Sequence, residues 1–268
     1  MRVSLYQLDV FADQLFAGNP AAVCPLQAWL PDALMQQIAA ENNLSETAFF
    51  VADDSGEADF LLRWFTPTQE IELCGHATLA SAQVLFDELG WSSSSIRFRT
   101  LRAGVLQVER REDGLWLDLP ATTLQPLSEV PVALAQALGA QPLQVFSAND
   151  KWVALFAFAR TVEGLHPDFT ALRSLPVAAV SVTAPGRASE DFVSRYFGPA
   201  QGIDEDPATG SAHAWLLPYW AARIGRDELL AAQLSPRGAR LRCRMKDQRV
   251  EISGGLQLYL RGEIVLPS

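Results

Sequence analysis

Two apolar helical segments, one in each half of the chain, constrain its fold more than any other feature of the sequence. Residues 75–89 are rich in Ala and Leu, and as a helix they would be apolar on nearly every face. A second apolar segment follows at residues 209–222. A helix that is hydrophobic on every face has to be buried on every face. The sequence therefore predicts a buried central helix in each half.

Short strand-like runs separated by turn residues make up most of the remaining chain. In the first half they are predicted at residues 3–10, 46–51, 59–66, 104–108 and 115–119, and in the second at 144–147, 152–158, 177–182 and 191–197. Three more follow the second helix, at 240–245, 248–252 and 256–265, with Gly254 and Gly255 as a turn. A proline followed by apolar residues at helical spacing predicts one further helix at 31–42.

The entrances of the two apolar helices resemble each other. Residues 74–78 (CGHAT) open the first helix and residues 206–211 (DPATGS) open the second, and both place small residues there. Their equal position relative to the strands favours an α+β fold of two similar lobes with a cleft between them. The polar, proline-bearing stretch 120–131 predicts a boundary between domains 1–119 and 120–268, although the last strand could return to the N-terminal lobe.

Charge and cysteine content argue against several classes of partner. Twenty-one Lys and Arg against 31 Asp and Glu leave the 268 residues with a net charge of −10, which disfavours nucleic acid binding. The three cysteines form no CxxC pair, which is typical of reduced thiols in a cytoplasmic protein. The apolar stretches fall far short of the about 20 residues of a transmembrane helix, and three scattered histidines disfavour a metal site. Neither a membrane role nor a metal is indicated.

The two helix entrances are candidate anion sites, because the first backbone N–H groups of a helix lack partners within it. Gly75 and Gly210 would let a ligand approach the backbone closely. The alternative is structural: the glycines allow tight helix packing, and Thr78, Thr209 and Ser211 cap helices. Spacing alone favours this structural alternative.

Three groups are candidates for proton transfer. Glu46 precedes the apolar run 48–51, where a partly buried carboxylate could act as a general base, but a solvated Glu at a loop end fits the spacing better. His76 could shuttle a proton, donate to a substrate or be structural, with equal weight. The acidic residues 204–206 could simply complement the dipole of the helix that follows.

A set of motifs, in this order along the chain, resembles the phenazine-biosynthesis PhzF-like isomerase family: 18–23 (GNPAAV), 43–47 (NLSET), 63–67 (RWFTP), 75–78 (GHAT) and 205–212 (EDPATGSA). The matches run over nearly the whole chain, and the last motif is long enough to be specific. The resemblance implies the diaminopimelate-epimerase-like fold, in which each lobe is a curved, mostly antiparallel, barrel-like sheet wrapped around a central helix. This agrees with the internal duplication.

The resemblance also implies site residues, and it implies neither cofactor nor metal. Glu46 matches the family's proton-transferring carboxylate. The supporting catalytic residues it implies are His76, Asp206 and Ser211, and the substrate-binding residues are Asn19, Gly75, Thr209 and Gly210. A base positioned at carbon and preorganised donors for the developing charge suit a proton shift.

The expected function is therefore a cofactor-independent isomerase of a biosynthetic process, which moves a proton between carbons of a small carboxylic acid and could form a homodimer. Two alternatives stay open: an epimerase or racemase of an amino-acid derivative, and a non-catalytic protein that binds a small acid. Two-base epimerases use one cysteine from each lobe, and here only Cys74 is a thiol. Residues 235–238 and the arginines that follow depart from the family pattern, which leaves the substrate undefined.

Overall fold

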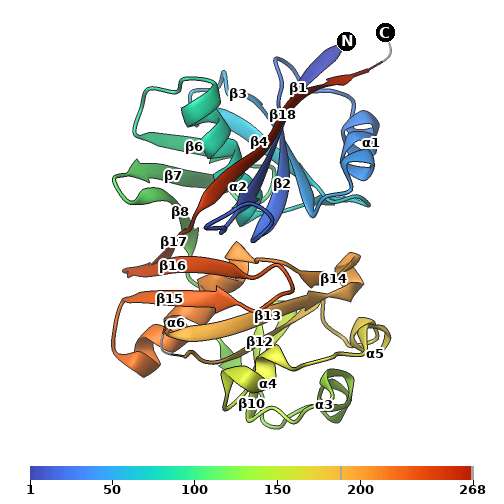
Figure 1. The fold of residues 1–268 in the computed structure, drawn as a ribbon, viewed down its shortest axis with the longest axis vertical. Helices are drawn as coiled ribbons and strands as arrows, with labels where there is room; N and C mark the ends of the chain where they lie inside the picture. The colour runs from blue at the N-terminus through green and yellow to red at the C-terminus, as the bar shows by residue number, and fades with distance from the viewer. Residues whose placement is uncertain (188, 267–268) are drawn as a thin grey trace. The chain divides into compact units, whose positions relative to one another are not determined.

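The computed structural model describes residues 1–187 and 189–266. The chain divides into two compact units, of which the first comprises residues 1–118 and 253–268 and the second residues 119–252 (Figure 1). None of the helices in the described ranges is long and apolar enough to cross a membrane.

The first unit is a curved sheet. Its strands are β1 (Arg2–Val10), β2 (Asn19–Pro25), β3 (Glu46–Ala52), β4 (Phe60–Phe65), β5 (Glu70–Ile71), β6 (Ser95–Arg99), β7 (Val105–Arg111), β8 (Gly114–Pro120) and β18 (Leu256–Val265). Neighbouring strands pair in the order β18, β1, β2, β3, β4, β6, β7 and β8. The short strand β5 also pairs with β4. Two of these pairings, β2 with β3 and β4 with β6, are parallel, and the others are antiparallel.

The helix α2 (Gly75–Gln83) lies at the centre of this unit, against β1, β2 and β3, as the sequence predicts. All of its residues from Gly75 to Ala82 are buried. The buried hydroxyl of Ser81 has a hydrogen-bond acceptor within the helix, because its Oγ donates to the carbonyl of Ala77 at 2.8 Å. A single π-helical turn, η1 (Val84–Glu88), replaces the end of the predicted helix.

The other face of the first sheet carries α1 (Asp32–Asn42). Met35, Ile38 and Ala39 of α1 pack on Phe49 and Phe65 in a buried apolar cluster. The cluster explains the helical spacing of apolar residues in this segment, since only one face of α1 is covered.

The second unit repeats the plan of the first. Its strands are β9 (Gln125–Pro126), β10 (Gln144–Ala148), β11 (Lys151–Leu155), β12 (Ala179–Pro185), β13 (Phe192–Gly198), β14 (Ile203–Asp206), β15 (Glu228–Gln233), β16 (Ala239–Lys246) and β17 (Arg249–Ser253). They pair in the order β9, β10, β11, β12, β13, β15 and β16, with β14 on β13. The two parallel pairings fall at the same steps as in the first unit, β11 with β12 and β13 with β15.

The second apolar helix is α6 (His213–Ile224), which follows the 3₁₀ turn η3 (Gly210–Ala212) and packs against β15 and β16. Three short helices, α3 (Val132–Leu138), α4 (Ala159–Glu163) and α5 (Phe169–Arg173), pack with strands of the second unit in a buried apolar cluster. The 3₁₀ turn η2 (Pro199–Gln201) follows β13. These three short helices do not follow from the sequence pattern, because each is seven residues or shorter.

Six strands also lie outside the ranges predicted from the sequence: β2, β5, β6, β9, β14 and β15. The segment of β2 begins Asn-Pro, a turn signal, yet Pro20 lies opposite Asp9 in the pairing of β1 with β2. Tertiary pairing therefore overrides local preference there.

Candidate functional site

Glu46 is the first residue of β3, and the turn before it fixes its position. Asn43 ends α1 in the left-handed conformation, with φ 49°, so the chain reverses directly into β3. Asn42 Nδ2 donates to Thr47 Oγ1 at 3.0 Å, which ties the helix end to the strand. On the neighbouring strand Ala21 lies opposite Glu46. The side chain of Glu46 is only 9% exposed.

His76 comes from the second position of α2 and brings three other residues together. Its Nε2 lies 3.0 Å from Oε2 of Glu46. Its Nδ1 lies 3.3 Å from Asn19 Nδ2 and 3.4 Å from Cys74 Sγ. All four residues are buried. The first unit therefore gathers Asn19, Glu46 and His76, three of the residues predicted from the sequence, and adds the Cys74 thiol.

Gly18 accounts for the position of Asn19 in this group. Its φ is +63°, and a Cβ atom there would lie 2.1 Å from the carbonyl oxygen of Val10. Only glycine fits so close to the neighbouring backbone with that conformation. The GNP sequence thus turns the chain into β2 and places Asn19 at its first residue.

The partners of Nδ1 define the tautomer of His76. An amide N–H and a thiol are both donors, so Nδ1 accepts and the ring proton is assigned to Nε2, on the side of Glu46. The contact with Glu46 is at ion-pair distance but is not aligned as a hydrogen bond, since Oε2 has no hydrogen-bond partner among the described residues. A buried carboxylate oxygen therefore keeps a lone pair available to a substrate proton.

The same cluster offers possible metal ligands. Ligand atoms of Glu46, Cys74 and His76 lie within 4.8 Å of one another. However, the carboxylate faces Nε2 and the thiol faces Nδ1, whereas one ion binds one nitrogen of an imidazole ring. The arrangement of Glu46, His76 and Cys74 therefore suits proton transfer along the three side chains better than joint coordination of one metal ion.

In the second unit, the segment that opens α6 is held by Gln233 at the end of β15. Gln233 Oε1 accepts from the backbone N–H of Thr209 at 2.9 Å, and Gln233 Nε2 donates to the carbonyl of Asp206 at 2.8 Å and to Thr209 Oγ1 at 3.2 Å. The hydroxyl of Thr209 donates to the carboxylate of Asp206. Asp206 and Thr209 are thus brought together, with Gly210 buried beside them and Ser211 partly exposed.

An arginine braces the strand before this segment. Arg195 of β13 makes a bidentate pair with Glu205 at 2.7 and 2.9 Å, and its Nη1 donates to the carbonyl groups of Val162 and Leu165. Bidentate geometry with further carbonyl acceptors satisfies a buried guanidinium. Arg195 therefore holds Glu205, and with it the main chain next to Asp206.

The two helix entrances are built alike. Thr78 Oγ1 donates to the carbonyl of Cys74 at 2.6 Å, and His213 Nδ1 lies 2.9 Å from the carbonyl of Thr209, four residues earlier in each case. Complete burial lowers the pKa of His213 to about 4, so the ring is neutral and Nδ1–H donates. Thr209 thus occupies the position that Cys74 holds in the first unit.

Gln233 and Arg195 were not singled out as site residues in the sequence. The one available signal for Gln233 is a glutamine at the end of the otherwise apolar run LLAAQ. The roles of the predicted residues remain predictions: the structure brings together Asn19, Glu46 and His76 in one unit, and Asp206 and Thr209 in the other.

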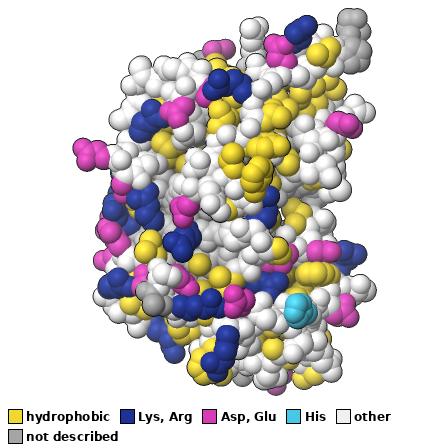
Figure 2. Space-filling model, in the orientation of Figure 1, with side chains coloured by type: hydrophobic (Ala, Val, Ile, Leu, Met, Phe, Trp, Pro, Cys, Tyr) yellow, Lys and Arg dark blue, Asp and Glu magenta, His cyan; other side chains and the backbone are white. Residues whose placement is uncertain are grey.

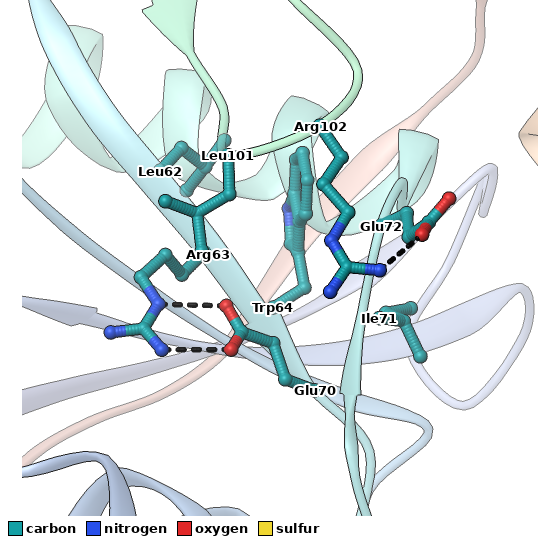
Figure 3. Close-up of a pocket in the computed structure, with 8 residues that line it drawn as sticks. All are labelled: Leu62, Arg63, Trp64, Glu70, Ile71, Glu72, Leu101 and Arg102. Carbon is teal, nitrogen blue, oxygen red and sulfur yellow. Dashed lines mark hydrogen bonds and ion pairs between the residues drawn. The ribbon is translucent and has the colours of Figure 1, made fainter.

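A separate hollow of about 90 Å³ opens on the first unit near β4 and β5 (Figure 3). Arg63 pairs with Glu70 there, and Arg102 pairs with Glu72. Both guanidinium groups are neutralised by carboxylates, and the lining contains none of the predicted site residues. The hollow therefore offers no positive site for a small acid.

Comparisons with known proteins cover the whole fold. A family model described as phenazine biosynthesis-like protein matches residues 8–261. An uncharacterized isomerase of Pseudomonas aeruginosa is 48% identical over 266 residues, which is 99% of this chain and 100% of that protein. The crystal structure of a PhzF-family phenazine biosynthesis protein from Enterococcus faecalis has a TM-score of 0.93 at 43% identity, covering 99% of this chain and 100% of that one.

A more distant structure extends the comparison of the fold alone. A hydroxyproline epimerase from Agrobacterium vitis has a TM-score of 0.63 at 12% identity, covering 98% of this chain and 92% of that one. The fold class expected from the sequence, α+β with two similar lobes of the diaminopimelate-epimerase-like kind, is confirmed.

Proposed function

The chain belongs to the phenazine biosynthesis-like protein family, and from that premise we propose that it is a cofactor-independent isomerase with Glu46 as its general acid and base. The reaction proposed is the movement of a proton between two carbons of a small carboxylic acid. Relatives named as isomerases support the reaction class. The choice of base and of substrate class comes from the chemistry of the site.

One observation carries the proposal: Glu46 Oε2 is buried, lies 3.0 Å from His76 Nε2, and has no aligned hydrogen bond among the described residues. A base that removes a proton from carbon needs such an oxygen, free of competing donors and fixed in position. Glu46 takes the proton from one carbon and returns it to another. The alignment with His76 can tighten when substrate binds, as catalytic hydrogen bonds commonly do.

His76 would support both states of Glu46. With its proton on Nε2 it stabilises the carboxylate before the transfer, and with Asn19 at Nδ1 its ring is held in orientation. The first N–H groups of α2, at Gly75 and His76, are the proposed donors to the substrate carboxylate or to the charge that develops on it.

Asp206, Thr209, Gly210 and Ser211 of the second unit are proposed to act in the same reaction. The hydrogen bonds of Gln233 order this segment, and a preordered segment loses little entropy on binding substrate. Ser211, the partly exposed hydroxyl of the group, is proposed as a donor to the substrate. Ser211→Ala tests this role through a rise in KM.

Exchange of hydrogen for deuterium tests the proposal most directly. The protein is incubated in deuterated water with a panel of small cyclic, branched and unsaturated carboxylic acids, and proton NMR follows loss of carbon-bound hydrogen. We expect exchange with some members of the panel and none with Glu46→Gln. Exchange at the same rate in Glu46→Gln would contradict the proposed base.

An epimerase or racemase is a second candidate, and the thiol of Cys74 favours it. Sγ lies 3.4 Å from His76 Nδ1, close enough for the imidazole to take its proton. The matching position at the second helix entrance is Thr209, so a two-thiol mechanism lacks its second base. Chiral analysis of the products and the Cys74→Ala variant separate the two candidates.

A further inference from the structure

The side chain of Arg63, on β4, contacts carboxylates of two other elements. Its Nε and Nη2 donate to the two oxygens of Glu70 on β5, both at 2.7 Å (Figure 3). Its Nη1 donates to Oδ1 of Asp32, the first residue of α1, at 2.8 Å. The guanidinium carbon lies 5.4 Å from the ring centroid of Trp29 and 5.2 Å from that of Phe65. One guanidinium therefore joins β4, β5 and α1.

Ion pairs are common on the surface of this chain, and most of them do little to fix its structure. On the face shown in Figure 2, Lys and Arg side chains lie beside Asp and Glu side chains. Exposed pairs of this kind contribute little, because water screens the charges and two long side chains lose freedom. A bidentate pair is different, since two parallel hydrogen bonds fix the orientation of the carboxylate. Arg63 makes a bidentate pair, and its side chain is only 11% exposed.

The second unit contains the same pair at the matching place. Arg195 donates from Nε and Nη2 to the two oxygens of Glu205, at 2.7 and 2.9 Å. Its guanidinium carbon lies 5.0 Å from the ring centroid of Phe197, two residues later, just as Arg63 lies over Phe65. In both units the arginine comes from a long strand, and the glutamate from the next strand of the chain, which pairs with it.

The spacing from each glutamate to the helix entrance that follows it is also the same. Cys74 comes four residues after Glu70, and Thr209 comes four residues after Glu205. Cys74 and Thr209 are the corresponding positions of the two entrances, since the carbonyl of each accepts a side-chain hydrogen bond from four residues later. The same pair at the same spacing in both units indicates that each arginine helps to build the helix entrance that follows it.

We infer that Arg63 is a positioning residue for the proposed reaction, because it fixes the two segments that carry Glu46 and His76. On one side, Glu70 precedes His76 by six residues. On the other side, Asp32 begins α1, the helix whose end reverses directly into Glu46 at the start of β3. The inference rests on the proposed function, in which Glu46 is the base and His76 supports it.

A second contact ties α1 to the same region. Gln36, one helical turn after Asp32, donates from Nε2 to the carbonyl of Thr66 at 2.9 Å, in the turn between β4 and β5. A helix held at both places cannot shift along β5 without breaking these contacts. The 3.0 Å separation of Glu46 Oε2 and His76 Nε2 depends on that arrangement. A displacement of about 1 Å between reacting groups can cost on the order of 100-fold in rate.

The imidazole of His76 reports on this positioning without any substrate. The chain has three histidines, so the NMR signals of the His76 ring can be assigned by replacing His166 or His213 with Asn. Arg63→Lys keeps the positive charge, but one ammonium nitrogen cannot reproduce the two parallel hydrogen bonds to Glu70. We expect the ring signals of His76 to move or broaden in this variant, and those of His166 and His213 to stay in place.

Arg99→Lys is the matched control. Arg99 of β6 makes a bidentate pair of the same kind with Asp53, at 2.8 and 2.9 Å, in the same unit. Asp53 follows the last residue of β3, whereas Glu46 is its first, so this pair touches neither segment of the site. The His76 signals should stay in place in Arg99→Lys.

Glu70→Gln is a milder second variant, because the amide keeps one acceptor oxygen and the Glu70 side chain is 31% exposed. It should move the same His76 signals as Arg63→Lys. Circular dichroism and urea unfolding confirm that each variant is folded. With any acid of the deuterium-exchange panel that the parent chain accepts, kcat of Arg63→Lys should fall about tenfold or more, whereas Arg99→Lys should keep the parental kcat.

Unmoved His76 signals in folded Arg63→Lys and Glu70→Gln would overturn the inference. So would equal displacement of these signals in Arg99→Lys, or a parental kcat in Arg63→Lys. Displaced His76 signals in a chain that exchanges no acid of the panel would uphold the positioning of His76 by Arg63 and count against the proposed function alone. The two failures can therefore be told apart.

Discussion

Glu46 Oε2 lies 3.0 Å from His76 Nε2, although the two residues come from different elements, the start of β3 and the first turn of α2. The parallel pairing of β2 with β3 places Glu46 beside Ala21, two residues after Asn19, whose amide meets the other nitrogen of the same imidazole. The pairing of β2 with β3 and the start of α2 thus bring Asn19 and Glu46 to the two nitrogens of the His76 ring.

Replacing Glu46 with glutamine should abolish turnover and leave the fold intact. The amide is nearly isosteric with the carboxylate but cannot accept the proton, so kcat should fall on the order of 100-fold or more. Deuterium exchange and turnover of an identified substrate measure the effect. Glu41→Gln, an exposed carboxylate on α1, is the matched control and should keep full activity. Parental turnover by Glu46→Gln would remove Glu46 from the mechanism.

Cys74→Ala should keep most of the activity if Glu46 is the base, at a cost of about 1 kcal/mol in the free energy of unfolding. Cys24→Ala is the control for stability, because Cys24 is also buried and burial raises its thiol pKa to about 12. Similar denaturation midpoints for the two variants, with loss of activity in Cys74→Ala alone, would favour the thiol-dependent epimerase.

Gln233→Leu should destabilise the second unit by about 2 kcal/mol, because it leaves the N–H of Thr209 and the carbonyl of Asp206 without their buried partner. If the segment acts in the reaction, kcat should fall at temperatures where the variant is still folded. Gln136→Leu, an exposed glutamine on α3, is the control. Unfolding in urea and initial rates give the two readouts. An unchanged rate in the folded variant would show that ordering of this segment does not limit the reaction.

His213 should make stability depend on pH between about 6.5 and about 4. Burial lowers its pKa from 6.5 to about 4 in the folded protein, so between these values the unfolded chain binds the proton and the folded chain does not. The stabilisation is complete above pH 6.5 and is lost as the pH falls through this window, by on the order of 3 kcal/mol in all.

His213→Asn tests that dependence, because the amide can still donate to the carbonyl of Thr209 but does not titrate in this range. Urea unfolding measured from pH 4 to pH 8 should show a flatter profile than the parent chain. His166→Asn, at an exposed position, should leave the profile unchanged. Equal slopes for His213→Asn and the parent would contradict the assignment.

The sequence alone was sufficient for the features that depend on local pattern. The helices α2 and α6 follow from continuous apolar composition, because a segment without a polar face can only be central. Glu46, His76 and Asp206 could be predicted as site residues, because the motifs that contain them occur in the order typical of a known family. The similar sequences at the two helix entrances indicated two similar lobes. Each of these signals lies within a few neighbouring residues.

Tertiary structure decided which distant segments meet. Nothing in Asn19–Pro25 indicates that it lies between β1 and β3, and nothing in LLAAQ indicates that Gln233 closes on Thr209. Likewise β18 crosses from the end of the chain to pair with β1 at its beginning. Such pairings depend on surfaces created only when the strands are already assembled, so the free energy that selects them is absent from any local window of sequence.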